Sequence, residues 1–294
     1  MMPGVDGPEA SPEARVGTSA QAPAETRADV RRRREAEQRS AVPDSANTVH
    51  LPLLLVTVVT CGLLVLAVRA EPAILAAALA WCALILAGGL PHLYGISPDW
   101  PVATPIGIAG IGTAVAAGVV DTAPHLRLVP IALAAGTVLS CLLQILRRDG
   151  REGLVLSLSV AGAGLALIAM GIAYVPVARL RDGADLVTAA LAGVAVSALA
   201  DLFVGRQRVR PWLLPLSMVL GGCAGALVAV VAGAPRSTLG LLLGMMAAAT
   251  AYLVRRLATS LPTVGGLRAQ GSAAAASVLA PGVVTYVIGL LFLG

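Results

Sequence analysis

Nine apolar runs, each long enough to cross a lipid bilayer as a helix, follow one another from Leu51 to the end of the sequence. A helix needs about 20 predominantly apolar residues to cross the hydrocarbon core, and short polar interruptions separate the runs. The predicted fold class is therefore all-α, a polytopic transmembrane helical bundle of about nine spans over residues 46–294. The predicted spans are 51–68, 72–90, 102–120, 128–146, 153–178, 186–204, 212–234, 238–254 and 273–293. Residues 257–272, with Pro262 and three glycines, are predicted to form a loop.

The composition excludes several classes of protein. Hydrophobic residues make up 57% of the chain and charged residues 13%, about half the charged fraction of an ordinary soluble domain. A soluble globular enzyme is therefore excluded. Every basic residue is an arginine, which excludes any mechanism that needs a lysine. Aromatic residues make up only 3%, so we expect no stacking platform for bases and no nucleic-acid partner.

Residues 1–45 form a polar segment rich in Pro, Glu, Ala, Ser and Arg, with seven arginines against eight acids. Such a segment cannot bury enough apolar surface to offset its ordering entropy, so we predict a disordered cytoplasmic tail. Arginines 31–34 and Arg39 lie shortly before the first span. Two interpretations stay open for this cluster: a topology signal, or attraction to anionic lipid headgroups.

The arginine distribution predicts the orientation of the spans. With nine spans and a cytoplasmic N-terminus, the inner segments hold fourteen arginines and the outer loops five, as the positive-inside rule expects. The loop over residues 91–101 is predicted to be inside, yet it carries no arginine. The bias towards Ala, Arg, Gly and Val indicates a GC-rich bacterial genome, and hence a bacterial plasma membrane.

Two pairs of glycines and four cysteines lie within the apolar runs. Gly221 with Gly225, and Gly240 with Gly244, form GxxxG motifs that let helix backbones approach closely. We interpret them as packing within one chain, with a dimer interface as the alternative. The cysteines have no CxxC spacing and no histidine at metal-ligand spacing, so we predict neither a disulfide framework nor a metal site: Cys61, Cys82, Cys141 and Cys223.

Asp201 is the one acid clearly inside an apolar run, in the stretch ALADLFVG. Charged groups inside a membrane are costly and therefore mark functional sites. In one interpretation Asp201 is a metal or headgroup ligand at the membrane surface. In the other it pairs with Arg206 and ends the sixth span.

Two basic loops are candidate sites for a phosphate group. Arginine binds phosphate oxygens with a two-pronged fork, and both loops are predicted on the same side of the membrane. The alternative is that these loops only set the orientation of the chain. The candidate lipid- or phosphate-binding residues are Arg147, Arg148, Arg206, Arg208, Arg210 and Asp201.

The order of these features resembles that of the bacterial phosphatidate cytidylyltransferases, the CDP-diacylglycerol synthases, over residues 171–294. The motifs that carry the resemblance are Phe203-Val204-Gly205-Arg206, then Pro215 with Gly221, the loop 266–271 (GLRAQG), and Ala280-Pro281 with Tyr286 in the last span. The resemblance implies a nine-span fold and an activity that transfers a cytidylyl group to a lipid phosphate.

The acidic residues of that family are missing from the matching positions. Ala198 stands near the family's metal-binding aspartate, with Asp201 three residues away, and Ala269 replaces the acid of the last loop. Activation of CTP requires a divalent metal held by carboxylates. We therefore expect a non-catalytic protein that binds a membrane lipid, such as an anionic phospholipid, or stabilises a membrane-protein partner. The alternatives are a small permease or channel component, and an active cytidylyltransferase, the one case in which magnesium is expected.

Overall fold

The computed structural model describes residues 50–119, 127–147, 153–206, 208–233, 237–261 and 263–293. In these ranges nine helical segments are long and apolar enough to cross a membrane, which confirms the polytopic helical bundle. The tail expected over residues 1–45 lies outside the described residues. The helices are α2 (Leu51–Ala70), α3 (Pro72–Leu93), α4 (Trp100–Val119), α5 (Val129–Leu146), α6 (Leu154–Ile172), α7 (Tyr174–Ala178), α8 (Gly183–Ser197), η2 (Ala198–Phe203), η3 (Arg210–Trp212), α9 (Leu213–Val231), α10 (Ser237–Thr259), α11 (Leu267–Leu279) and α12 (Gly282–Leu293).

The outer faces of the helices are apolar. Ile145, Val155 and Val231 are among the most exposed side chains, with 76–80% of their surface accessible. The interior is instead filled largely by small residues, alanine above all, together with leucine and valine. Helices whose outer faces meet lipid have no need of a polar surface, and small residues let their backbones approach. This distribution of side chains is that of a bundle embedded in a membrane.

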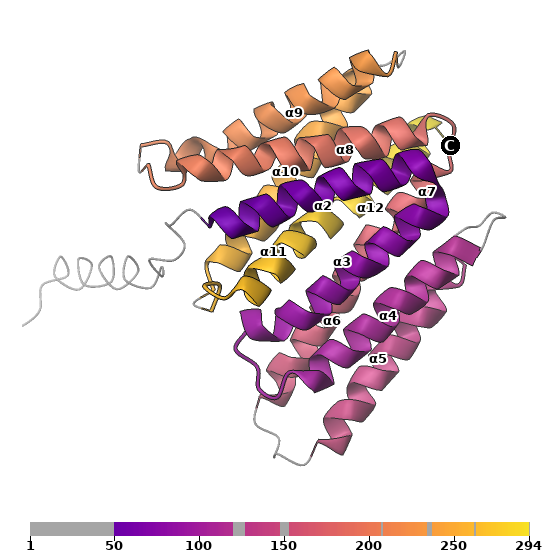
Figure 1. Ribbon diagram of the computed structural model, residues 1–294, viewed down its shortest axis with the longest axis vertical. Coiled ribbons are helices and arrows are strands. Elements are labelled where there is room, and N and C mark those ends of the chain that lie inside the picture. The colour runs from indigo at the N-terminus through magenta and orange to yellow at the C-terminus, as the bar shows by residue number, and fades with distance from the viewer. Residues whose placement is uncertain are drawn as a thin grey trace, which may run out of the picture. The chain divides into compact units, whose positions relative to one another are not determined.

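Consecutive spans run in opposite directions, so the loops gather at two ends of the bundle (Figure 1). We call the end where α2 begins the arginine end, and the other, where α2 turns into α3 at Glu71, the opposite end. Of the described residues, the arginine end holds Arg147, Arg206, Arg208, Arg210, Arg255, Arg256 and Arg268 with the acids Asp99 and Asp201. The opposite end holds Arg69, Arg127, Arg179 and Arg181 with the acids Glu71, Asp182 and Asp185. Positive charge is therefore concentrated at the arginine end.

Helix α11 lies in the interior, where it packs against α2, α3, α6 and α10. It corrects the prediction of a loop over residues 257–272, because α10 continues to Thr259 and α11 begins at Leu267. The sequence LRAQGSAAAASVL is not strongly apolar, since Gln270, Ser272 and Ser277 are buried against protein instead of facing lipid. Alanine is the best helix former, so this segment is helical without being a lipid-facing apolar run.

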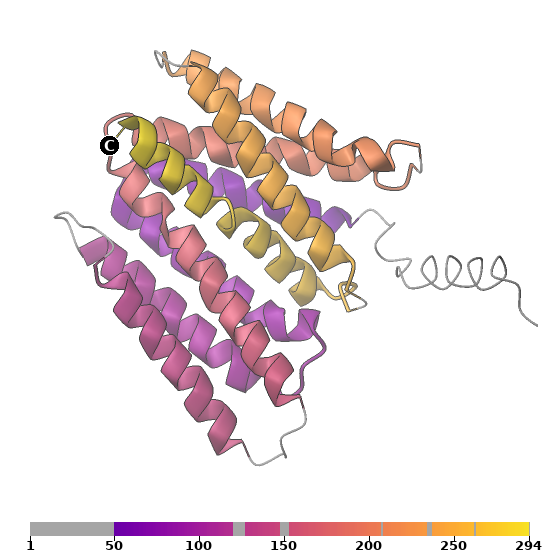
Figure 2. The same ribbon diagram turned by 180° about the vertical axis from the view of Figure 1, so that it is seen from behind.

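Two of the spans are interrupted, and their interruptions pack against each other. The span α11–α12 breaks at Ala280-Pro281, and the span α6–α7 breaks at Ala173 (Figure 2). Pro281 has no N–H group and so cannot continue the helical hydrogen-bond pattern. A Cβ atom on Gly282 would lie 2.1 Å from the carbonyl oxygen of Met170, so glycine is required for this contact. At the same place the Tyr174 hydroxyl donates a hydrogen bond of 3.1 Å to the Val278 carbonyl.

Replacing Tyr174 by Phe is expected to lower the free energy of unfolding by about 1 kcal/mol, the net value of a buried hydrogen bond. The ring, which is completely buried, remains and keeps its packing. Unfolding of the purified protein in mixed micelles measures the loss. Tyr286→Phe is the control, because Tyr286 is only partly buried and is expected to change stability by less than about 0.5 kcal/mol. Equal losses in the two variants would contradict this role of the hydroxyl.

Helices α9 and α10 pack closely together, and the two GxxxG motifs form their contact. A Cβ atom on Gly225 would lie 2.2 Å from the carbonyl oxygen of Gly240, and one on Gly244 would lie 2.2 Å from that of Gly221. In the same region, a Cβ atom on Gly193 of α8 would lie 2.8 Å from the carbonyl oxygen of Gly244. The interpretation of these motifs as packing within one chain is confirmed. Close approach of α8, α9 and α10 also brings together polar side chains of α8, η2 and α10.

Candidate functional site

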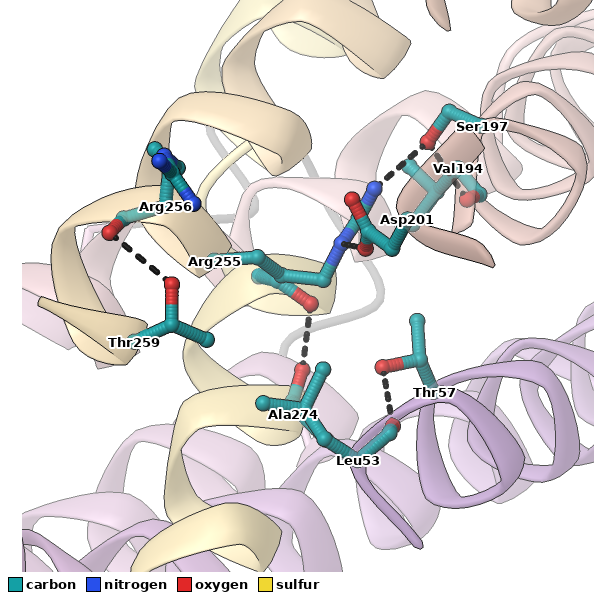
Figure 3. A network of polar contacts seen from close by, with 10 residues as sticks. Leu53, Thr57, Val194, Ser197, Asp201, Arg255, Arg256, Thr259 and Ala274 are labelled. Carbon is teal, nitrogen blue, oxygen red and sulfur yellow. Dashed lines mark hydrogen bonds and ion pairs between the residues drawn. The ribbon is translucent and has the colours of Figure 1, made fainter. Parts of the chain in front are cut away.

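A buried ion pair joins α10 to the end of α8 near the arginine end (Figure 3). The Arg255 Nε atom donates a hydrogen bond of 2.6 Å to Asp201 Oδ2. Its Nη2 atom donates a second, of 3.1 Å, to the Ser197 hydroxyl, which itself donates to the Val194 carbonyl at 2.7 Å. The Arg255 side chain is 1% exposed and the Asp201 side chain 20%. We call Arg255, Asp201 and Ser197 the buried arginine cluster.

Local helix geometry brings these three residues together. Helix α8 ends at Ser197 and continues as the 3₁₀ helix η2, which carries Asp201. Residues four apart lie on the same helix face, so Ser197 and Asp201 both face α10. Arg255 lies on the stripe of α10 that is buried against α8 and α9, one helical turn after Ala251. The cluster therefore depends on the close packing that the glycines allow.

The guanidinium group of Arg255 is not fully satisfied by the described part of the chain. Its Nη1 atom is buried and has no hydrogen-bond partner among these residues. The neighbouring Thr57 hydroxyl of α2 donates to its own helix, at the Leu53 carbonyl (Figure 3). The Ser277 hydroxyl of α11 likewise donates within its own helix, to the Ala274 carbonyl. The oxygen atoms of both hydroxyls keep acceptor capacity. The cluster is thus a polar centre between α8, η2 and α10 inside an otherwise apolar bundle.

The predicted pairing of Asp201 with Arg206 is wrong. The partner is Arg255, which comes from another span, whereas the Arg206 guanidinium lies over the Phe203 ring, 5.3 Å from its centroid. Residues 203 and 206 lie in and just after η2, where the chain turns away from the bundle. Arg255 lies just outside the predicted span 238–254, because the apolar run ends at Val254. Its spacing of four residues from Ala251 and three from Ala258 on the buried stripe is the signal that places it inside α10.

The candidate arginines lie at the arginine end but not in one site. Arg147 follows α5, which packs against α4 and α6, whereas Arg206, Arg208 and Arg210 precede α9, which packs against α8 and α10. Arg148 lies outside the described residues. The Arg147 Nη2 atom donates a hydrogen bond of 3.2 Å to the Ser97 carbonyl. The two basic loops therefore mark separate edges of the bundle.

One of these edges combines arginines with aromatic side chains. Arg206, Arg208 and Arg210 are exposed, and so are the neighbouring Trp212, at 67%, and Phe203, at 36%. Aromatic rings are enriched where a membrane protein meets the interface between lipid and water. We call these five residues the arginine–aromatic surface.

A third polar group lies at the arginine end of α3, in the loop predicted over residues 91–101. The Arg268 Nη1 atom lies 3.4 Å from His92 Nε2, which lies 3.5 Å from Asp99 Oδ2. The Thr263 hydroxyl donates a hydrogen bond to the Leu93 carbonyl. These contacts join the loop before α11 to the end of α3. The absence of arginine from residues 91–101 is offset in space by Arg268 and Arg147.

The cysteines do not contribute to these groups as metal ligands. Cys61 and Cys82 are buried, while Cys141 and Cys223 are exposed on the outer faces. No group of three or more His, Cys, Asp or Glu side chains with the spacing of a metal site occurs in the described ranges. The one carboxylate inside a described span near this end, that of Asp201, is already engaged by Arg255.

Comparison of the chain with models of protein families, with curated proteins and with solved structures gives no match. A functional assignment therefore depends on the geometry of the chain's own residues. They form a membrane-spanning helical bundle with a buried arginine cluster and an arginine-rich end.

Proposed function

We propose that this chain is a non-catalytic membrane protein that binds anionic phospholipid headgroups at its arginine end. The observation that carries the proposal is the arginine–aromatic surface, Phe203, Arg206, Arg208, Arg210 and Trp212, with its exposed guanidinium groups beside exposed rings. Guanidinium forks suit phosphate oxygens, and aromatic side chains anchor at the headgroup level. The concentration of arginines at this end supports an orientation in which it faces the cytoplasm of a bacterial cell.

The engagement of Asp201 supports the non-catalytic part of the proposal. Transfer of a cytidylyl group requires carboxylates that are available to hold a divalent metal against the triphosphate. Asp201 instead accepts a 2.6 Å hydrogen bond from Arg255, and alanines stand at positions 198 and 269. In this proposal, the chain resembles the phosphatidate cytidylyltransferases as a relative that does not transfer a cytidylyl group. It keeps a lipid-binding role or stabilises a partner membrane protein.

Removing two arginines from the arginine–aromatic surface is expected to weaken retention of anionic phospholipid. A basic side chain near an anionic surface contributes about 1 kcal/mol, so Arg208→Gln with Arg210→Gln is expected to lower the affinity at least about tenfold. Native mass spectrometry of protein released from mixed phosphatidylglycerol and phosphatidylcholine bilayers measures the retained lipid.

The matched control removes the same charge from the opposite end. Arg127 and Arg181 are both exposed there, and Arg127→Gln with Arg181→Gln is expected to leave retention within about twofold of the unchanged protein. Equal retention of the two lipids by the unchanged protein would overturn the proposal. Equal losses in the two double variants would show that net charge, and not this surface, attracts the lipid.

A second candidate function is that of a small permease or channel component. It is favoured by the two interrupted spans, α6–α7 and α11–α12, which meet in the interior next to the hydrogen bond from Tyr174 to Val278. Many transporters form their substrate sites at such interruptions. Solute flux into proteoliposomes supports this candidate if Tyr174→Phe changes its rate, and absence of flux across a broad panel of solutes excludes it.

A further inference from the structure

Helices α2 and α3 enclose an apolar groove on the outside of the bundle. They separate from the turn at Glu71 towards the arginine end, and α11 lies in the opening between them (Figure 1). The groove has a volume of about 650 Å³. Its walls include Leu55, Val59 and Leu63 on α2 and Ala78, Trp81 and Ile85 on α3. We call it the α2–α3 groove.

The chemistry of the groove matches a hydrocarbon chain. Its volume falls within the range of about 300–1,000 Å³ that is typical of small-molecule sites. The lining is almost entirely aliphatic, and the exposed Trp81 ring, at 62%, projects from the middle of α3. Because both helices span the membrane, the groove opens towards lipid acyl chains.

A positively charged group lies beyond the arginine end of the groove. Ile85, in the groove wall, is 3.5 Å from the position of a Cβ atom on Gly271 of α11. Arg268 precedes Gly271 by three residues, which is about one helical turn, or 5 Å. Gly89, one turn after Ile85 on α3, contacts the backbone of Arg268. The exposed Arg268 side chain therefore begins about one turn beyond the last residue of the groove.

The charges around Arg268 favour an anion. His92 lies 3.4 Å from the Arg268 guanidinium, and Arg147 reaches the Ser97 carbonyl in the same loop. Among the described residues of this group, Asp99 is the acid, and its Oδ2 atom lies 3.5 Å from His92 Nε2. A phospholipid carries its phosphate about one helical turn above the start of its acyl chains, which is the separation between Arg268 and the groove.

We propose that the α2–α3 groove holds an acyl chain of an anionic phospholipid whose phosphate binds Arg268 beside His92. This inference rests on the proposed function. To the headgroup contacts of the arginine–aromatic surface it adds a second site, which also holds an acyl chain. The lipid comes from the leaflet at the arginine end. Arg268 gives the site its selectivity for an anionic headgroup. The apolar walls around Trp81 determine how deeply the acyl chain enters the bundle.

Quenching of Trp81 fluorescence by brominated acyl chains tests the proposal. Trp100→Phe with Trp212→Phe leaves Trp81 as the one tryptophan of the chain, since the sequence has three. In phosphatidylcholine bilayers, brominated phosphatidylglycerol is expected to bind beside Trp81 about fivefold more tightly than brominated phosphatidylcholine. Arg268→Gln in this background is expected to bring the ratio to about one, whereas Arg127→Gln leaves it unchanged.

A second pair of variants tests the groove itself. Ala78→Phe fills the groove, whereas Ala77→Phe adds the same ring to an exposed neighbouring position outside its lining. The proposal expects the preference for phosphatidylglycerol at Trp81 to disappear in the first variant and to persist in the second. Equal quenching by the two lipids, or a preference that survives Arg268→Gln, overturns it. If retention of anionic phospholipid still depended on Arg208 and Arg210 in that case, the proposed function would remain and only the groove site would be excluded.

Discussion

Replacing Asp201 by Ala is expected to lower the free energy of unfolding by about 3–5 kcal/mol, because it leaves the Arg255 charge buried without its partner. Arg255 is 1% exposed, and Asp201 Oδ2 accepts its shortest hydrogen bond, of 2.6 Å. Replacing Arg255 as well, by Met, removes the buried charge and keeps an apolar side chain of similar length. The double variant Asp201→Ala with Arg255→Met is therefore expected to recover much of the loss.

The control for this prediction is an ion pair at the opposite end. Arg69 Nη2 lies 2.7 Å from Asp185 Oδ1, but the Arg69 side chain is 49% exposed. Exposed pairs contribute about 0–1 kcal/mol, so Asp185→Ala is expected to cost no more than that. Unfolding in mixed micelles compares the four proteins. Similar losses in Asp201→Ala and Asp185→Ala, or a double variant no more stable than Asp201→Ala, would contradict the buried arginine cluster.

Replacing Gly244 by Val is expected to lower the free energy of unfolding by about 3 kcal/mol, the upper end of the usual cost of overpacking. A Cβ atom at this position would lie 2.2 Å from the Gly221 carbonyl oxygen and 3.1 Å from the Gly225 Cα atom. Both are backbone atoms and cannot move aside as a flexible side chain does. The helices α9 and α10 must separate, which also loosens the contact with α8.

The matched control is Gly62→Val. Gly62 lies on the exposed face of α2, where an added Cβ atom has no other atom within 4 Å. We expect its free energy of unfolding to stay within about 0.5 kcal/mol of that of the unchanged protein. Unfolding in mixed micelles again compares the variants. If Gly244→Val were as stable as Gly62→Val, the close approach of α9 and α10 would be wrong.

The lengths of the apolar runs were sufficient to predict the spans, because hydropathy acts locally along the chain. Helix α2, for example, covers Leu51–Ala70 where residues 51–68 were predicted. The GxxxG motifs likewise predicted close packing within the chain, since glycine spacing determines how closely two backbones approach, and in the structure the two motifs meet each other. Local signals failed at α11, whose first six residues, 267–272, precede the predicted start of the last span. This helix is buried in protein, so alanine, serine and glutamine are tolerated there. A search for long apolar runs therefore does not find its start.

The site was less predictable because it depends on pairing between distant segments. Asp201 stands out in the sequence as an acid inside an apolar run, but its partner Arg255 is 54 residues away in the sequence. The predicted span 238–254 ends one residue before Arg255, although Gly244, Ala247 and Ala251 already mark the buried stripe that Arg255 continues. The two basic loops were predicted on one side of the membrane, and their described arginines, Arg147, Arg206, Arg208 and Arg210, all lie at the arginine end. Their separation follows from the packing order of the helices, which the spacing of residues does not encode.

Binding of anionic phospholipid without cytidylyl transfer is tested most directly when lipid binding and nucleotide chemistry are followed in one sample. The purified protein in phosphatidylcholine bilayers receives phosphatidate, CTP and magnesium, and native mass spectrometry follows bound lipid while released pyrophosphate is measured. We expect that phosphatidate is retained in preference to phosphatidylcholine, that CTP does not bind and that no pyrophosphate appears. Magnesium-dependent CTP binding with release of pyrophosphate, or retention of the two lipids in proportion to their abundance, would contradict this expectation.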